Sequence, residues 1–306
     1  MLPSENLVLM VSRPNSRVCQ ALRSTRTAWH TTLAARAMAR KLCFTALFAT
    51  LLCAVLCARA HALCSLMQAC QAPASCPIFT DAAPPQFDVH WSTTRGNFTM
   101  HVTTSWAPPY AQRLWVLAKL GYFVGGPFFR VLNMPHATPP QAFVAQWGYS
   151  GNPPVDNCWD KHLTSNATWS VHEPGNVRGT VTFAMDGVAN THTNPNCSSA
   201  SSYCAQGFSS NIFINLQDNS KLLDPPGFSP IGTVDAAGMA VVDALYAGYG
   251  EVASLCPAGA QDPFCVGTGA ACQGVNVTRL LAGGMAYVKR EKPLLDVVVG
   301  VTAVAA

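Results

Sequence analysis

Phe128-Phe129-Arg130-Val131, followed by Phe143-Val144-Ala145-Gln146-Trp147-Gly148, is the part of this 306-residue chain that decides its fold. It places an arginine and a glutamine among aromatic and branched residues that are typical of β-strands. An arginine directly behind two phenylalanines is unusual on an apolar strand, because a buried guanidinium needs polar partners. Taken alone, Arg130 is equally consistent with a side chain that reaches water from a strand end. Gln146 alone is consistent with a polar strand residue that faces water.

Further stretches stand in order on both sides of this pair. Upstream lie a strand-like segment over 87–99 and the step Trp106-Ala107-Pro108 into a helix over 111–120. Downstream lie segments 178–185, 210–215, 218–224 and 227–232, and then a second helix over 238–245. Together these stretches resemble the cyclophilin family of peptidyl-prolyl cis-trans isomerases, over roughly residues 87–301. The resemblance is strongest to the branch typical of bacterial members and of secreted algal or protist members.

The resemblance implies a mainly-β fold, namely a closed eight-stranded antiparallel β-barrel capped by two α-helices, in one domain over 87–303. Local patterns agree with such a fold. Phe98, Met100 and Val102 alternate with polar residues, as a half-buried strand requires. Leu114 and Leu117 stand at helical spacing, directly after two prolines that are typical of a helix start.

The activity that the resemblance implies is rotation about X–Pro bonds, which faces a barrier of about 18–20 kcal/mol. A catalyst has only to bind the twisted amide more tightly than either planar isomer, so neither a cofactor nor a metal is expected. The resemblance assigns Arg130 as the catalytic donor to the imide nitrogen, and Gln146 as the group that orients Arg130 and holds a substrate carbonyl. It assigns these substrate-binding residues: Phe143, Val144, Ala184, Met185, Asn211, Phe213, Leu223 and Phe228.

Within this set, Phe143, Val144, Phe213 and Leu223 are expected to line a proline pocket. The main chain of Met185, beside Ala184, is expected to pair with the bound peptide as an added strand would. Without the family context, Phe213 and Leu223 are equally consistent with plain core packing.

Several positions depart from the family pattern. Asn211 stands where many members have glutamine, and Phe228 where many have a histidine at the pocket rim. Leu222 stands where a tryptophan associated with cyclosporin binding is common, and Met185 replaces a common asparagine. An insertion over 133–141 contains three prolines, so it is expected to be stiff. It would form a wall of the substrate groove or, alternatively, point away from it.

The first 62 residues differ in charge from the rest of the chain. They hold eight of the 19 Lys and Arg and one of the 15 Asp and Glu, which leaves 11 basic and 14 acidic residues for 63–306. This balance gives no support to a nucleic-acid role, which requires a basic folded face. The apolar run 42–58 lies between Arg40-Lys41 and Ala60-His61-Ala62, a pattern that predicts a secretory signal peptide.

Two alternatives for this leader, 1–62, stay open. An uncleaved signal anchor would hold the protein on a membrane. Residues 1–37 are either upstream of a true start at Met38 or a targeting extension. The segment that follows, 63–86, is rich in Cys and Pro and is interpreted as a linker or a disulfide-tied arm.

Nine cysteines follow the leader, and they point to an oxidising compartment. They are Cys64, Cys70, Cys76, Cys158, Cys197, Cys204, Cys256, Cys265 and Cys272. A zinc site is a poor alternative, because no Cys-x-x-Cys motif occurs. We predict a bridge between Cys197 and Cys204, and an odd count leaves one thiol free or paired with another chain. Four sequons, at Asn97, Asn166, Asn196 and Asn276, agree with secretion and glycosylation.

Three functional hypotheses follow. The first is an active, monomeric prolyl isomerase that assists the folding of proline-containing or unfolded chains in the secretory pathway, outside the cell or in a plastid. The second is a catalytically weak module that binds proline-containing peptides on the same fold, because a fold alone does not determine function. The third is a disulfide-rich structural protein, which the core motifs argue against. For the first hypothesis, Arg130→Ala is expected to lower activity and to change stability little.

Overall fold

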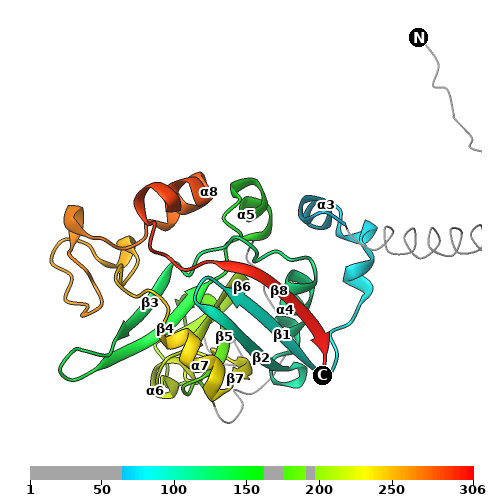
Figure 1. Ribbon diagram of the computed structural model, residues 1–306. Helices are drawn as coiled ribbons and strands as arrows, with labels where there is room; N and C mark the ends of the chain where they lie inside the picture. The colour runs from blue at the N-terminus through cyan, green and yellow to red at the C-terminus, as the bar shows by residue number, and fades with distance from the viewer. Residues whose placement is uncertain (1–63, 162–174, 191–196) are drawn as a thin grey trace, which may run out of the picture. The chain divides into compact units, whose positions relative to one another are not determined.

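The computed structural model describes residues 64–161, 175–190 and 197–306 (Figure 1). The chain divides into two compact units, 1–61 and 62–306, and the first lies outside the described residues. The predicted signal peptide and the sequons at Asn166 and Asn196 therefore lie outside them as well. In the described part of the chain, no helix combines the length and the apolar character needed to cross a membrane.

One antiparallel sheet of eight strands forms the centre of the second unit (Figure 1). The strands follow one another in the sheet in the order β3-β4-β6-β5-β7-β2-β1-β8. Their bounds are β1 (Gln86–Thr93), β2 (Gly96–Thr103), β3 (Arg130–Met134), β4 (Gln141–Trp147), β5 (Thr180–Ala189), β6 (Tyr203–Asn215), β7 (Pro230–Val234) and β8 (Val298–Ala305).

The expected closed barrel is not confirmed, because β3 and β8 stand at the two ends of the strand order. A single bridge between Pro127 and Val297 links the segments that precede them. Hydrogen bonds from Phe128 N to Asp296 O and from Gly125 N to Val298 O lie beside that bridge. Residues 120–125 form turns rather than a continuation of β3, so the contact between the two edges stays short.

The strand expected over 87–99 is divided into a hairpin. Thr93 Oγ1 accepts hydrogen bonds from the backbone N–H groups of Arg95 and Gly96, which turns the chain between β1 and β2. Gly96 has a φ of 145°, which favours glycine. The predicted alternation in β2 is confirmed, because Phe98, Met100 and Val102 are all buried.

Helix α4 (Pro108–Lys119) is the first of the two predicted helices, and it begins earlier than expected because Pro108 and Pro109 occupy its first turn. Its buried face packs against β6 and β8. The core beside it is aromatic: the ring of Trp91 lies 5.1 Å from those of Phe123 and Trp147 in edge-to-face contacts.

The described part of the chain contains more helices than the two that were predicted. The second predicted helix is α7 (Ala236–Asp243), which begins behind Asp235, whose carboxylate accepts from Gly238 N at 2.7 Å. A longer helix, α8 (Val277–Glu291), was missed. Shorter helices are α3 (Leu66–Gln71), α5 (Pro153–Trp159) and α6 (Ser220–Leu223), with 3-10 turns η1 (Pro73–Ser75), η2 (Pro77–Thr80), η3 (Thr104–Trp106), η4 (Ala253–Leu255) and η5 (Gly269–Ala271).

The described part of the chain contains four disulfides. They are Cys64–Cys76, Cys70–Cys158, Cys197–Cys204 and Cys256–Cys265. The third is the predicted bridge, which is confirmed. Among the described residues, Cys272 is the cysteine without a disulfide.

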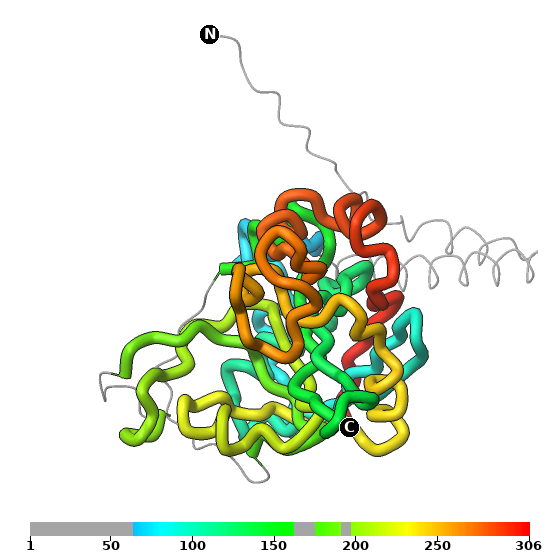
Figure 2. Tube along the Cα trace, turned by 90° about the vertical axis from the view of Figure 1, so that its left-hand side faces the viewer, coloured from blue at the N-terminus to red at the C-terminus, as the bar shows by residue number. Residues whose placement is uncertain are grey.

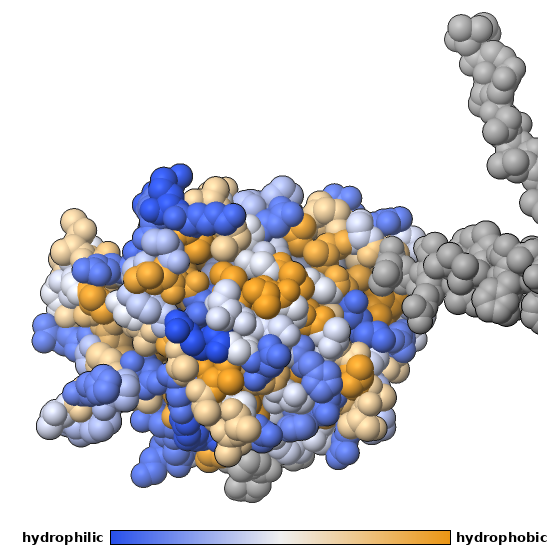
Figure 3. Space-filling view, viewed as in Figure 1, coloured by the Kyte–Doolittle hydropathy of each residue, from blue (hydrophilic) through white to orange (hydrophobic). Residues whose placement is uncertain are grey.

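Two disulfide-bonded regions lie outside the sheet. Cys70–Cys158 ties α3 to α5, and the ring of Phe79 stacks on that of Trp159. Cys256–Cys265 closes a loop within 250–275, drawn in orange beside α8 in Figure 2. On the face drawn in Figure 3, apolar and polar residues are interspersed. Exposed valines of β8 include Val299 and Val304, which are 55% and 44% exposed.

Candidate active site

Arg130, Gln146 and Phe213 lie side by side on three adjacent strands. Arg130 of β3 pairs with Gln146 of β4, and Gln146 pairs with Phe213 of β6. Residues directly opposite in antiparallel strands project from the same face, with Cβ atoms about 4.5–5.5 Å apart. The register therefore brings the predicted catalytic pair together. Arg130 Nη1 donates to Gln146 Oε1 at 3.1 Å.

Glu251 is the strongest partner of Arg130, and sequence reasoning missed it. Arg130 Nε donates to Glu251 Oε1 and Arg130 Nη2 donates to Glu251 Oε2, both at 2.6 Å. This two-bond fork is the geometry in which a guanidinium and a carboxylate interact most strongly. The Glu251 side chain is 1% exposed and that of Arg130 is 18% exposed. A buried guanidinium requires a polar partner, but Glu251 stands 121 residues from Arg130 in the chain and no local sequence pattern points to it.

The guanidinium of Arg130 is held on several sides. Its central carbon lies 5.7 Å from the centre of the Phe143 ring, a cation–π contact. Of its five N–H donors, three are engaged by Glu251 and Gln146. Two donors therefore have no partner among the described residues, and the side chain is 18% exposed.

An apolar cluster next to this pair unites most of the predicted substrate-binding residues. Its buried members are Val144, Ala205, Phe213, Leu223 and Phe228, and the half-buried Phe143, Ala184, Met185 and Tyr203 pack against them. Phe213 and Phe228 meet edge to face with ring centres 6.2 Å apart. Ala205 and Tyr203 were not predicted, because they lie at the start of β6, before the recognised motif. Whether this cluster receives a proline ring stays a prediction.

A buried polar network positions two members of the cluster. Asn219 Nδ2 donates to Phe143 O at 2.9 Å, which ties the start of α6 to β4. Asn176 Nδ2 donates to Asp224 Oδ1 and to Phe228 O, both at 2.6 Å. Asn176 and Asn219 are 0% and 4% exposed, so these bonds are shielded from water. The network holds the turn that carries Leu223 and Phe228 against the sheet.

Asn211 lies outside the apolar cluster, although it projects from the same face of β6 as Phe213, two residues further along the strand. It stands beside Gly148, where an added Cβ would lie 2.3 Å from the Asn211 Cα. Asn211 is 7% exposed, and its Oδ1 has no hydrogen-bond partner among the described residues. The pKa of the neighbouring Tyr149 is raised, chiefly by burial. Leu222, at the expected rim, is 57% exposed.

Two cavities lie apart from the Arg130 pair and the apolar cluster. One of about 380 Å³ is lined by the insertion residues Asn133, Pro135 and Pro140 together with Arg178 and Asp243. The insertion thus lines a cavity of mixed polar and apolar residues, and its effect on peptide entry stays a prediction.

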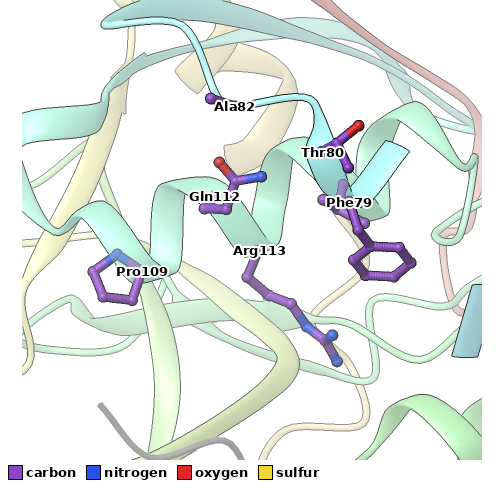
Figure 4. A pocket seen from close by; sticks show the side chains of 7 residues that line it. Phe79, Thr80, Ala82, Pro109, Gln112 and Arg113 are labelled. Atoms are coloured by element: carbon purple, nitrogen blue, oxygen red, sulfur yellow. The ribbon is translucent and has the colours of Figure 1, made fainter. Parts of the chain in front are cut away.

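The other cavity, of about 350 Å³, lies between residues 79–82 and α4 (Figure 4). Phe79 and Thr80 line it from one side, and Gln112 and Arg113 from the other. Burial lowers the pKa of Arg113 to about 10, so this side chain stays charged at neutral pH. Its guanidinium donates to Ser209 O and Trp159 O, both at 2.9 Å, so it serves to hold α4 to its neighbours. No group of three or more His, Cys, Asp or Glu side chains placed to hold a metal occurs within 64–161, 175–190 and 197–306.

Known proteins similar to this chain are found among solved structures. No protein-family model matches the chain, and no curated protein matches it. A solved structure described as a cyclophilin-type peptidyl-prolyl cis-trans isomerase of Cryptosporidium parvum is 10% identical, covers 72% of this chain and 99% of its own, and has a TM-score of 0.40. A second structure of that protein, in the presence of the dipeptide Ala-Pro, is 12% identical, covers 52% of this chain and 86% of its own, and has a TM-score of 0.35. Likeness at this level does not place the chain in a family.

Proposed function

We propose that the chain is a diverged, secreted-type cyclophilin, a peptidyl-prolyl cis-trans isomerase. One observation carries this proposal. A fixed guanidinium with two unused donors, that of Arg130, stands on the same sheet face as the apolar cluster around Phe213. Those are the two elements that the reaction requires, a charged donor and a surface for the proline ring.

The chemistry follows from the loss of amide resonance. When the X–Pro bond twists, the imide nitrogen becomes pyramidal and regains a lone pair, which a donor can then bind. A hydrogen bond from Arg130 would be stronger in the twisted state than in either planar isomer, so it would lower the barrier. Gln146 would keep the guanidinium in place through its bond at 3.1 Å and hold a substrate carbonyl.

The peptide would lie along β5 and contact the exposed edge of the apolar cluster. Phe143, Ala184 and Met185 are half-buried, so part of their surface is open to a ligand. The pairing of β5 with β6 is irregular on both sides of Met185. Such a bulge takes main-chain groups out of the ladder, where an added peptide strand could pair with them.

The secretory location is part of the proposal. Four disulfides suit an oxidising compartment, because thiols are kept reduced in the cytosol. The clients would be proline-containing or unfolded chains in that compartment, and the native protein would begin near Leu63. N-terminal sequencing of native material tests this point, and a native start at Met1 or Met38 in a membrane fraction would favour the signal anchor instead.

A second candidate function is a weak binding module for proline-containing peptides. The observation that favours it is the tight packing of the apolar cluster. Val144, Phe213, Leu223 and Phe228 are between 1% and 8% exposed, and neither cavity described above includes them. A cluster with so little exposed surface would bind a proline ring at its edge without stabilising the twisted X–Pro bond.

A protease-coupled assay on an Ala-Pro peptide separates the two functions. The isomerase predicts acceleration by the wild type and its loss in Arg130→Ala, whereas the binding module predicts peptide binding without acceleration. Arg95→Ala is the matched control, because Arg95 also forms an ion pair with a buried carboxylate, that of Asp296, outside the site. Equal acceleration by the wild type and by Arg130→Ala would remove Arg130 from the mechanism.

A further inference from the structure

We propose that Glu251 is a positioning residue, which fixes the plane of the Arg130 guanidinium and thereby aims its two unused donors at the substrate. The role rests on the proposed isomerase function. It adds to that function a residue from the loop between α7 and α8, far in sequence from the Arg130 and Gln146 strands. Four features of the structure support it.

The first feature is the geometry of the contact. A single hydrogen bond, such as that from Arg130 to Gln146 Oε1, leaves a guanidinium free to rotate about the bond. Two parallel bonds of 2.6 Å from Arg130 to one carboxylate remove that rotation. The ion pair also has no net charge, so Arg130 would act as an aimed donor and would contribute little long-range attraction for acidic peptides.

The second feature is that the carboxylate is itself immobilised. Glu251 Oε1 also accepts from Val252 N at 2.7 Å, and Glu251 N donates to Phe264 O at 3.0 Å. At 1% exposed, the side chain has no route to water that would compete with Arg130. A buried carboxylate without a partner is strongly unfavourable, so the pair is expected to persist throughout the folded state.

The third feature is the loop that presents Glu251. Gly250 forms a bridge with Cys265, which is bonded to Cys256, and Ala253 N donates to Val275 O at 3.0 Å. At Gly250, with φ 64°, an added Cβ would lie 2.1 Å from Phe264 O. The disulfide-closed loop therefore packs directly against the backbone of Glu251.

The fourth feature is a second apolar cluster, which contains the chain neighbours of both Arg130 and Glu251. Phe129, next to Arg130, and Val252, next to Glu251, belong to one buried cluster with Tyr149 and with Leu280 and Tyr287 of α8. The backbones on the two sides of the ion pair are thus fixed relative to each other. Positioning groups act in this way, through rigid support of the group that touches the substrate.

A purely structural role, in which the pair only ties the loop to β3, makes a different prediction. It would require stability to change on substitution and turnover per folded molecule to stay constant. We therefore compare Glu251→Gln, which keeps the side-chain shape and removes the charge, with Glu251→Asp, which keeps the charge and withdraws it by one methylene. Asp296→Asn is the matched control, because Asp296 is 5% exposed and accepts from Arg95 and from Tyr246 N outside the site.

The experiment measures kcat and KM on an Ala-Pro peptide, the thermal midpoint of each variant, and the Nε–H resonance of Arg130 by NMR. We expect Glu251→Gln to lower kcat by about 10–100-fold, the range found for residues that orient metal ligands, with little change in KM. The Arg130 Nε–H resonance should shift and exchange faster with water. Glu251→Asp should lose less activity, and Asp296→Asn should lose stability with kcat retained.

The outcomes separate the two proposals. An inactive, folded wild type would overturn the isomerase function and the role of Glu251 with it. An active wild type together with a folded Glu251→Gln that keeps its full kcat would overturn the role of Glu251 alone. If Glu251→Gln does not fold, Glu251→Asp decides, because a full kcat with an altered Arg130 Nε–H resonance would show that the fork is not needed.

Discussion

Because Arg130 pairs with the buried Glu251, we predict that Arg130→Ala lowers both stability and activity, each by a separate mechanism. The substitution leaves the carboxylate of Glu251, which is 1% exposed, without its counter-ion. Breaking a buried ion pair from one side typically costs about 3–5 kcal/mol of unfolding free energy. That is a large fraction of a typical total of about 5–15 kcal/mol. The structure thus revises the expectation, formed from sequence alone, that stability would change little.

The effect on catalysis has a different origin. Loss of a donor that acts in the transition state typically costs about 2.7–4 kcal/mol, or roughly 10²–10³-fold in kcat. Arg130→Lys should not restore activity, because an ammonium lacks the planar fork that matches the two carboxylate oxygens of Glu251.

A double-mutant cycle distinguishes the two effects. Urea unfolding and the protease-coupled assay are measured for Arg130→Ala, for Glu251→Gln and for the two together. The double variant should regain part of the stability that Arg130→Ala loses, because a neutral amide is less costly to bury than an unpaired carboxylate. It should regain no activity. An Arg130→Ala protein as stable as the wild type would refute the reasoning about the pair.

Three further predictions concern other parts of the molecule. Burial raises the pKa of the Asp156 carboxyl in the folded protein above its ordinary value of 3.8. The folded state therefore favours the protonated carboxyl. The stability that this carboxyl contributes is fully present below pH 3.8 and is lost as the pH rises through the folded-state pKa. Urea unfolding should therefore show the stability of the wild type relative to Asp156→Asn falling from acid to neutral pH, and a rise would contradict the sign. Replacing Cys256 and Cys265 by serine should lower the unfolding free energy by about 2–3 kcal/mol, measured by thermal unfolding. It should also lower kcat, because Glu251 would be held less rigidly. An unchanged kcat would show that the loop does not support the site. Trimming the insertion 133–141 to a short turn should change KM across a panel of X-Pro peptides and leave kcat nearly constant, and a constant KM would show that the loop does not meet the peptide.

The sequence was sufficient where the physics is local. Alternation in β2 and helical spacing in α4 depend on neighbouring residues, and both elements were found. The contact between Arg130 and Gln146 was expected from the family resemblance, and the pairing of β3 with β4 brings the two residues together. The Cys197–Cys204 bridge was predictable because it closes a short loop.

Helix α8 was missed because its local signals conflict. Asn276 caps the helix by accepting from Arg279 N, but Asn276-Val277-Thr278 was interpreted only as a glycosylation sequon. Gly283 and Gly284 disfavour a helix, and Gly284 indeed has non-helical dihedral angles. Packing of its apolar face against the cluster around Phe129 overrides these weak preferences.

Glu251 and the strand order could not be predicted for a different reason. The bond between Arg130 and Glu251 joins residues 121 positions apart, and neither flanking sequence marks the contact. The missing closure between β3 and β8 likewise depends on where turns end the edge strands rather than on the composition of those strands. Both features arise from tertiary packing, which a single sequence does not encode locally.

The most direct test of the proposed activity is exchange NMR on an X-Pro peptide in the presence of the folded protein. Uncatalysed isomerisation takes tens to hundreds of seconds at 25 °C, so cross-peaks between the cis and trans resonances at sub-second mixing times require catalysis. We predict such cross-peaks with the wild type and their loss with Arg130→Lys. Peptide resonances that shift on binding without any exchange between cis and trans would contradict the isomerase and leave the binding module as the function of this site.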